Sequence, residues 1–155
     1  GTPLKKNEKS TYNGMEVKRK YADKKGNEIN LSNVVQGDLV VVTIRVKPQK
    51  EKVYNLVVVD MLPAGFEVEN PRLASHGDID SDQEMSLSPA YQDIRDDRIL
   101  IFADEISDER SFSYTVRAVT PGRFTIPNIY VEAMYDPDIN GEEYRKEYLV
   151  VVPNN

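Results

Sequence analysis

The chain has 155 residues, no cysteine and a formal net charge of −6. This length supports one domain with its own core. The lack of cysteine excludes disulfides and thiolate metal sites, and the acidic balance argues against nucleic-acid binding.

The first residues differ in character from the rest of the chain. Residues 1–12 are polar and rich in lysine, which predicts a flexible leader. The chain starts at Gly1 without methionine, as after cleavage of an expression tag, and shows no apolar signal segment. We therefore expect a single domain over 13–155, excised from a longer protein that carries its targeting signal upstream.

Three segments alternate between apolar and polar residues in the way that half-buried strands do. They are 15–21, 39–46 and 110–119. Met15, Val17, Arg19 and Tyr21 share one face of the first strand, and Val40, Val42, Ile44 and Val46 share one face of the second. On the third strand the alternation predicts that Phe112, Tyr114, Val116 and Ala118 face inward.

The remaining strands are predicted from composition and turn residues. Residues 53–59 are apolar on both faces and predict a central strand. Residues 98–103 predict a further strand, and Pro127 makes 124–131 an edge strand or a bulged one. Residues 136–141 predict a loop, and 144–152 predict the last strand.

Residues 70–97 form the longest stretch without strand character. They predict an irregular loop, with a short helical turn at 91–97. The seven or eight strands expected elsewhere, joined by short links, predict an all-β fold: an antiparallel two-sheet β-sandwich related to the immunoglobulin type.

No group of residues forms a convincing catalytic or metal site. Asp78, Asp80, Asp82 and Glu84 alternate, but an EF-hand would need Gly and Glu where Gln83 and Pro89 stand. An acidic, solvated loop is the favoured interpretation, with a non-EF-hand calcium site as the alternative.

His76 is the sole histidine, and its neighbour Ser75 would point away from it on an extended chain. We interpret His76 as a loop residue, and we expect neither enzyme activity nor a cofactor.

Met134 and Tyr135 leave a predicted strand and enter a turn. Two large side chains at the end of a sandwich either cap the local core or form a contact surface for another domain.

Four runs, in order, resemble a known family. They are VVDMLPAGFEVENPRL at 58–73, DIRDDR at 93–98, YTVRAVTPGRF at 114–124 and AMYDP at 133–137. Together with the QGD strand start at 36–38, they resemble the last macroglobulin-like domain of bacterial alpha-2-macroglobulins over about 14–152.

The resemblance implies a non-catalytic domain of a large periplasmic or cell-surface protein, often a lipoprotein, that traps proteases. In that family a thioester in a separate helical domain captures the attacking protease, and the final domain packs against the thioester domain and shields the bond. The role of the shielding pair is implied for Met134 and Tyr135. The implied partners are the other domains of the parent chain, and target proteases through that parent.

Two alternatives remain open. The run DMLPAGF at 60–66 also occurs in repeat domains of bacterial surface adhesins, where such domains act as spacers, but this chain holds one copy. A carbohydrate-binding β-sandwich would have to use tyrosine, since tryptophan is absent.

Overall fold

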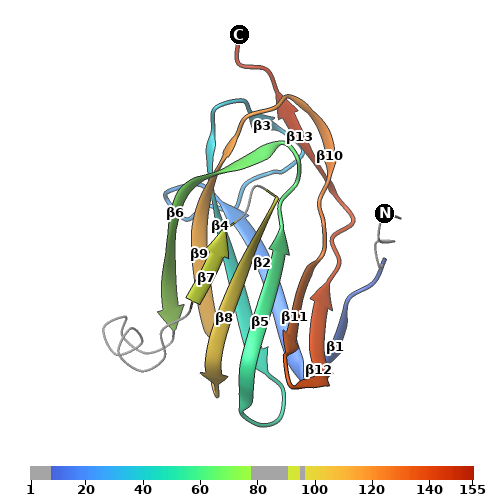
Figure 1. Cartoon of the computed structure of the whole chain (residues 1–155). Coiled ribbons are helices and arrows are strands. Elements are labelled where there is room, and N and C mark those ends of the chain that lie inside the picture. Colours follow the sequence, from blue (N-terminus) through green and yellow to red (C-terminus); the bar gives the residue numbers. More distant parts are fainter. Residues whose placement is uncertain (1–7, 78–90, 95–96) are drawn as a thin grey trace.

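A computed structural model describes residues 8–77, 91–94 and 97–155 (Figure 1). The backbone of these residues forms strands and connecting turns, without a helix long and apolar enough to span a membrane. The strands are β1 (Thr11–Asn13), β2 (Met15–Ala22), β3 (Val34–Val35), β4 (Leu39–Pro48), β5 (Val53–Met61), β6 (Phe66–Gly77), β7 (Tyr91–Ile94), β8 (Arg98–Ile106), β9 (Arg110–Ala118), β10 (Gly122–Thr125), β11 (Ile129–Ala133), β12 (Asp136–Glu143) and β13 (Tyr148–Val152).

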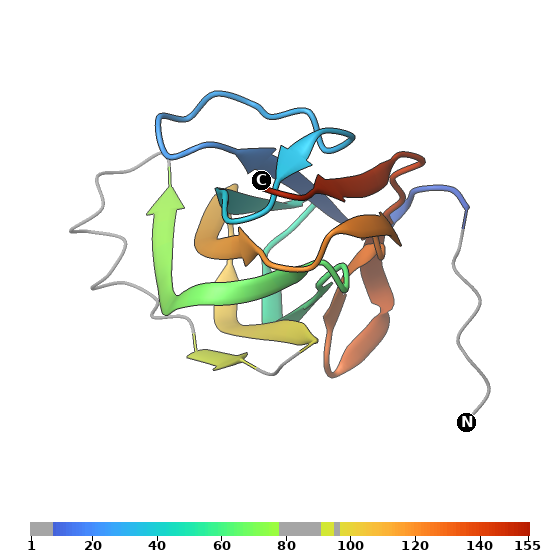
Figure 2. The same ribbon diagram turned by 90° about the horizontal axis from the view of Figure 1, so that it is seen from above.

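Two large antiparallel sheets face one another, which confirms the predicted sandwich (Figures 1 and 2). The six-stranded sheet has the order β1-β12-β11-β5-β8-β7, and the four-stranded sheet has the order β2-β4-β9-β6. A three-stranded sheet, β10-β13-β3, lies at the upper end in Figure 1, where β13 and β3 pair in parallel.

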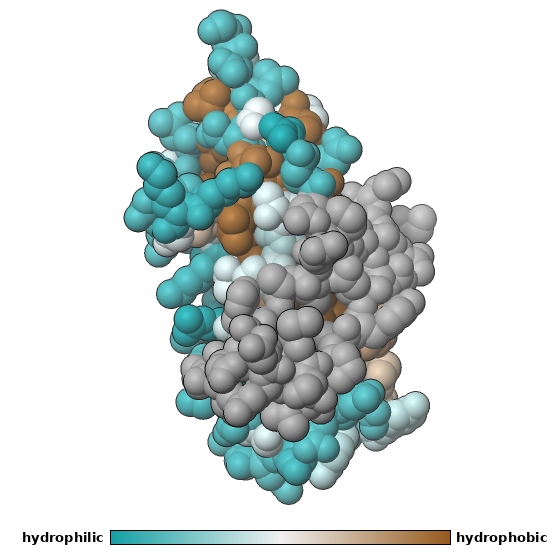
Figure 3. Space-filling model, turned by 90° about the vertical axis from the view of Figure 1, so that its left-hand side faces the viewer, coloured by the Kyte–Doolittle hydropathy of each residue, from teal (hydrophilic) through white to brown (hydrophobic). Residues whose placement is uncertain are grey.

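The core lies between the two large sheets and is built from alternating positions. One face of β4 and the predicted inward face of β9 are buried, with residues at most 3% exposed: Val40, Val42, Ile44, Val46, Phe112, Tyr114, Val116 and Ala118. The central position predicted for 53–59 is also confirmed, because β5 pairs with β11 on one side and β8 on the other. On the side seen in Figure 3, hydrophilic residues surround scattered hydrophobic ones.

The predicted irregular stretch at 70–97 is too long. Strand β6 continues to Gly77, and 91–94 form strand β7 rather than a helical turn. Residues 78–90 lie outside the described part of the chain. Strand β6 is an edge strand whose register shifts between Val68 and Asn70 and again between Asn70 and Ala74. Such bulges interrupt the two-residue period, so the sequence pattern indicates a loop.

Three further expectations about the second half of the chain are wrong. The predicted loop at 136–141 belongs to β12, and the last strand begins at Tyr148 rather than at 144. Pro127 interrupts the strand expected over 124–131, which is divided into β10 and β11. Near the start of the chain, β1 pairs Thr11 with Glu142 and Tyr12 with Gly141, so these two residues of the expected leader belong to the sheet.

A buried ion pair connects the two large sheets. Arg19 of β2 and Asp60 of β5 are 2% and 0% exposed, and Nη1 of Arg19 lies 2.5 Å from Oδ1 of Asp60. The hydroxyl of Tyr114 on β9 donates to the other carboxylate oxygen of Asp60, and Nη2 of Arg19 donates to the carbonyl of Pro127. One cluster thus joins β2, β5, β9 and the segment that leads into β11.

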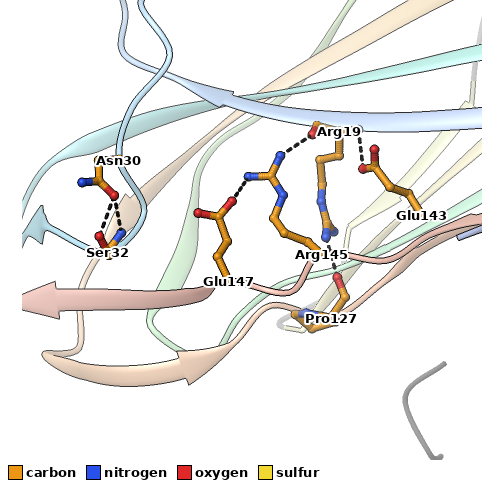
Figure 4. A network of polar contacts seen from close by, with 7 residues as sticks. All are labelled: Arg19, Asn30, Ser32, Pro127, Glu143, Arg145 and Glu147. Atoms are coloured by element: carbon orange, nitrogen blue, oxygen red, sulfur yellow. Dashed lines mark hydrogen bonds and ion pairs between the residues drawn. The ribbon is translucent and has the colours of Figure 1, made fainter. Parts of the chain in front are cut away.

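The backbone of Arg19 is also bound from outside its own sheet (Figure 4). A carboxylate oxygen of Glu143 accepts a hydrogen bond from the amide of Arg19 at 2.9 Å, and the guanidinium of Arg145 donates to the carbonyl of Arg19 at 3.1 Å. Because β2 is an edge strand, these side chains satisfy backbone groups that no neighbouring strand pairs. Burial raises the pKa of Glu143, although its hydrogen bond from Arg19 opposes that shift.

We expect Asp60→Ala to lower the free energy of unfolding by about 3–5 kcal/mol, because it leaves the Arg19 guanidinium buried without a counter-ion. Urea denaturation measures the loss. The double variant Arg19→Met with Asp60→Leu should lose less, since no charge then remains buried. Glu67→Ala, at an exposed carboxylate, should change stability by less than about 0.5 kcal/mol. An Asp60→Ala variant as stable as the original would contradict this account.

Stability should fall at high pH because of two buried tyrosines. Burial raises the pKa of Tyr21 to about 12 and, together with the charge of Asp60, raises the pKa of Tyr114 well above 10.0. Above pH ~10 the unfolded chain loses phenolic protons that the folded chain keeps, so the free energy of unfolding drops by up to about 1.4 kcal/mol per pH unit for each tyrosine.

Denaturation at several pH values between about 9 and 12 tests this expectation. Tyr114→Phe should make the decline shallower, whatever its effect at neutral pH. An equal slope in the Tyr114→Phe variant would show that Tyr114 does not contribute.

Candidate functional site

Met134 and Tyr135 form the two-residue turn between β11 and β12. The last pair of the hairpin joins Ala133 to Asp136, and the two residues between them are exposed, Met134 by 42% and Tyr135 by 83%. This exposure favours the second of the two interpretations of the sequence, a contact surface, over a cap on the local core. Hereafter these two residues are called the hairpin tip. They lie at the lower end of the molecule in Figure 1.

The turn breaks an alternation that would otherwise bury Tyr135. On β11 the residues Ile129, Val131 and Ala133 face the core and are at most 3% exposed. The next position in that series is Tyr135, which a continuing strand would direct inward. The chain reverses instead, so the largest side chain of the segment is presented to solvent.

Strand β12 carries a bulge directly after the tip. The register shifts between Glu132, which pairs with Asn140, and Ala133, which pairs with Asp136. The side-chain amide of Asn140 donates to the carbonyl of Pro137 at 2.8 Å and closes the bulge. Bulges at the end of a sheet redirect side chains and are typical of positions with a specific role.

Strand β5 contacts the hairpin through a residue in an unusual conformation. Asn55 has φ of 54° and is the sole non-glycine residue with positive φ in the described part of the chain. Its carbonyl accepts a hydrogen bond from the amide of Met134 at 2.8 Å, so the tip is tied to the neighbouring strand. The left-handed conformation costs an ordinary L-residue about 1–2 kcal/mol. Asparagine adopts it more readily than most residues.

The side-chain alternation of β5 changes phase at Asn55. Leu56, Val58 and Asp60 face the core, and the same series would place Tyr54 inward. The structure instead buries Val53, which is 2% exposed, and leaves Tyr54 55% exposed. The positive φ of Asn55 therefore turns Tyr54 outward.

The adjacent strand β8 changes phase at the same level. Ile99, Ile101 and Ala103 are buried, whereas Glu105, the next in the series, is exposed and Ile106 is buried. Tyr54 pairs with Glu105 and Val53 pairs with Ile106, so both strands rotate together. Three neighbouring strands thus turn a side chain outward at one end of the sandwich. We call this end, which carries Tyr54, Glu105 and the hairpin tip, the tip end.

The sequence indicated the hairpin tip but missed Tyr54 and Asn55. The sequence does contain a signal. In the run VYNLVVVD at 53–60, Val53 can face inward together with Leu56 and Val58 only if the two-residue alternation shifts by one residue near Asn55. The other sequence candidates do not gather here. His76 lies in strand β6, opposite Ser111, and not in a loop as predicted.

No metal site is present among the residues that the structure describes, where no three His, Asp or Glu residues cluster suitably. The acidic residues Asp78, Asp80, Asp82 and Glu84, interpreted as a solvated loop with calcium binding as the alternative, lie outside those residues.

Comparisons with known proteins give a consistent result. A family model described as the bacterial alpha-2-macroglobulin MG10 domain matches residues 14–138, which include the hairpin tip. An alpha-2-macroglobulin homolog from Yersinia pestis is 33% identical over 160 residues, covering 91% of this chain and 8% of that protein.

Solved structures agree. Salmonella alpha-2-macroglobulin reacted with methylamine superposes with a TM-score of 0.82 at 31% identity, over 99% of this chain and 10% of that one. A mutant of the Salmonella protein with a tyrosine replaced by glycine has a TM-score of 0.81, the same identity and the same coverage of both chains. The chain therefore spans about a tenth or less of the length of these relatives.

The likeness extends to the major pilin subunit of Bacillus cereus, with a TM-score of 0.59, over 91% of this chain and 41% of that one. At 12% identity it shows the fold alone.

The conformation of Asn55 gives a test of the site's construction. Asn55→Val should lower the free energy of unfolding by about 1–2 kcal/mol, because a β-branched residue resists positive φ. Asn55→Gly should cost less than Asn55→Val, since glycine adopts this conformation freely. Urea denaturation compares the two variants, and a valine variant as stable as the glycine variant would disprove the role assigned to the backbone at Asn55.

Proposed function

Because this chain belongs to the bacterial alpha-2-macroglobulin family, as its MG10 domain, we propose that it is a non-catalytic part of a protease-trapping protein. In this role it packs on another domain of the same polypeptide, and its hairpin tip shields a thioester held by that domain. The observation that carries the proposal is the exposure of Met134 and Tyr135 within the region that the family model matches.

The chemistry of a thioester supports a shielding role. A thioester reacts with water and amines, so it persists only where both are excluded, and an apolar side chain beside an aromatic ring provides such a cover. This chain has no cysteine, so the thioester belongs to another part of the parent polypeptide. The hairpin tip offers an exposed thioether and an exposed ring on a strand pair that is tied to the core.

Two properties of the relatives also support the proposal. The Salmonella relative was crystallised after reaction with methylamine, a small amine, and a second structure of that protein replaces one tyrosine by glycine. The relatives are also much longer than this chain, so other domains of a parent polypeptide are available as partners. Interfaces between domains of one chain bury about 600–1,500 Å². Domains held by an interface of that size could separate when a protease cuts the parent elsewhere.

The proposal includes a periplasmic or cell-surface location for the parent, where it would meet proteases that attack the cell envelope. The alternative role as a spacer of surface proteins has no support beyond the fold shared with the pilin subunit. The alternative as a carbohydrate-binding module gains no support from the structure.

We expect the double variant Met134→Ala with Tyr135→Ala, made in a parent that carries the thioester, to react faster with methylamine. The increase should be about tenfold or more, which corresponds to losing about 1.4 kcal/mol of protection. Release of the free thiol measures the rate. Tyr148→Ala, at a tyrosine that is 44% exposed on β13, is the matched control and should react at the original rate. An unchanged rate in the double variant would show that the tip is not a shield.

A further inference from the structure

Exposed large apolar side chains gather at the tip end. Among the side chains whose burial the structure describes, at 8–69 and 97–155, four large apolar ones are exposed: Tyr54, Met134, Tyr135 and Tyr148. The first three belong to the start of β5 and the adjoining hairpin tip. The fourth lies on β13, where the Arg123 guanidinium covers its ring at 4.0 Å. Three unpaired apolar side chains at one end of a small sandwich are unusual for a surface that faces only water.

The register of the strands puts Tyr54 next to the hairpin tip. Strands β11 and β5 pair Ala133 with Leu56, and the amide of Met134 continues this ladder by donating to the carbonyl of Asn55. The next residue beyond Met134 is Tyr135, and the next residue before Asn55 is Tyr54. The three side chains therefore share one rigid support, made of hydrogen-bonded backbone.

The display of Tyr54 carries an energetic cost. If β5 kept its alternation, Tyr54 would face the core and no residue would need positive φ. The fold instead holds Asn55 in the left-handed conformation and rotates β8 to match, so that Tyr54 and Glu105 both face outward. Local strain that persists in a well-packed structure is a sign of a functional constraint.

The surroundings of Tyr54 match the anatomy of a protein interface. Glu105, the cross-strand partner of Tyr54, forms an ion pair with Lys52 at 2.9 Å, and both side chains are partly exposed. An apolar centre with paired charges at its edge is typical of a surface that docks on another protein surface. An apolar patch on the partner fits this centre, because Lys52 and Glu105 already form an ion pair with each other.

We propose that Tyr54 forms one docking surface with Met134 and Tyr135, and that this surface receives an apolar patch on another domain of the same parent polypeptide. The occupant is assigned to the parent because the relatives extend far beyond the tenth that this chain spans. The inference rests on the proposed function and adds to it a contact residue on a second strand, with Asn55 as the residue that positions it.

Photo-crosslinking in the full-length natural protein tests the proposal. A benzophenone amino acid replaces Tyr54, Tyr135 or Tyr148, one position at a time. We expect positions 54 and 135 to crosslink to the same segment outside these 155 residues. Position 148 is the matched control, as an exposed tyrosine away from the tip end, and it should not reach that segment. In addition, Tyr54→Ala should reduce the crosslink from position 135 by about fivefold or more, the scale expected when an interface aromatic is truncated.

The outcomes separate this inference from the function on which it rests. Crosslinks from 135 but none from 54 would overturn the role of Tyr54 and leave the shielding role intact. A second outcome is that both positions form crosslinks while the Met134→Ala and Tyr135→Ala changes leave the rate of reaction with methylamine unchanged. This result would support the docking surface and reject the shield. No crosslink from either position, or a natural protein that ends with these residues, would overturn the docking surface itself.

Discussion

The ion pair between Arg19 and Asp60 is the constraint on which the arrangement of this sandwich depends. Its two charges come from opposite sheets and lie where water does not reach. Any packing that separated β2 from β5 would leave both charges buried without a partner, at a cost of several kcal/mol for each. Tyr114 and the carbonyl of Pro127 complete the cluster, so the apolar core around it can assemble in one relative position of the sheets.

This constraint reaches the tip end through β11. The Pro127 carbonyl that Arg19 binds lies just before β11, and Ile129 at the start of β11 pairs with Asp60 itself. The opposite end of the same short strand carries the hairpin tip. Because the strand is held at its start by a buried charge and at its end by the carbonyl of Asn55, the tip has little freedom to move relative to the core. A surface of this kind is pre-organised, which reduces the entropy lost when it docks on a partner.

The molecule therefore combines a conventional core with one end that departs from the rules of strand alternation. Strands β5 and β8 slip by one residue, and β11 turns back one residue before its alternation would bury Tyr135. Each departure exposes a side chain that regular alternation would direct inward. The relatives are far longer than this chain, and the proposed contact with another domain of a parent polypeptide would use this end of the molecule.

The sequence by itself determined the strands whose apolar residues repeat every second position, such as β2, β4 and β9, because a buried face imposes that period on the residues that form it. It also predicted the two-sheet sandwich and, through resemblance to a family, Met134 and Tyr135 as candidate site residues. Alternation grouped Arg19 with Met15, Val17 and Tyr21 on one face of its strand, but nothing local identified Asp60 as its partner.

Only the tertiary structure decided the rest. Strand β12, with the sequence DPDINGEE, has no apolar period and is a strand because β11 and β1 supply its hydrogen bonds. The outward turn of Tyr54 depends on one backbone dihedral angle at Asn55, and the pairing of β8 with β5 extends the phase change across the sheet. These features arise from hydrogen bonds and charges between segments far apart in the chain. The local sequence pattern reflects the backbone conformation that a residue prefers, whereas tertiary packing determines which distant residue it contacts.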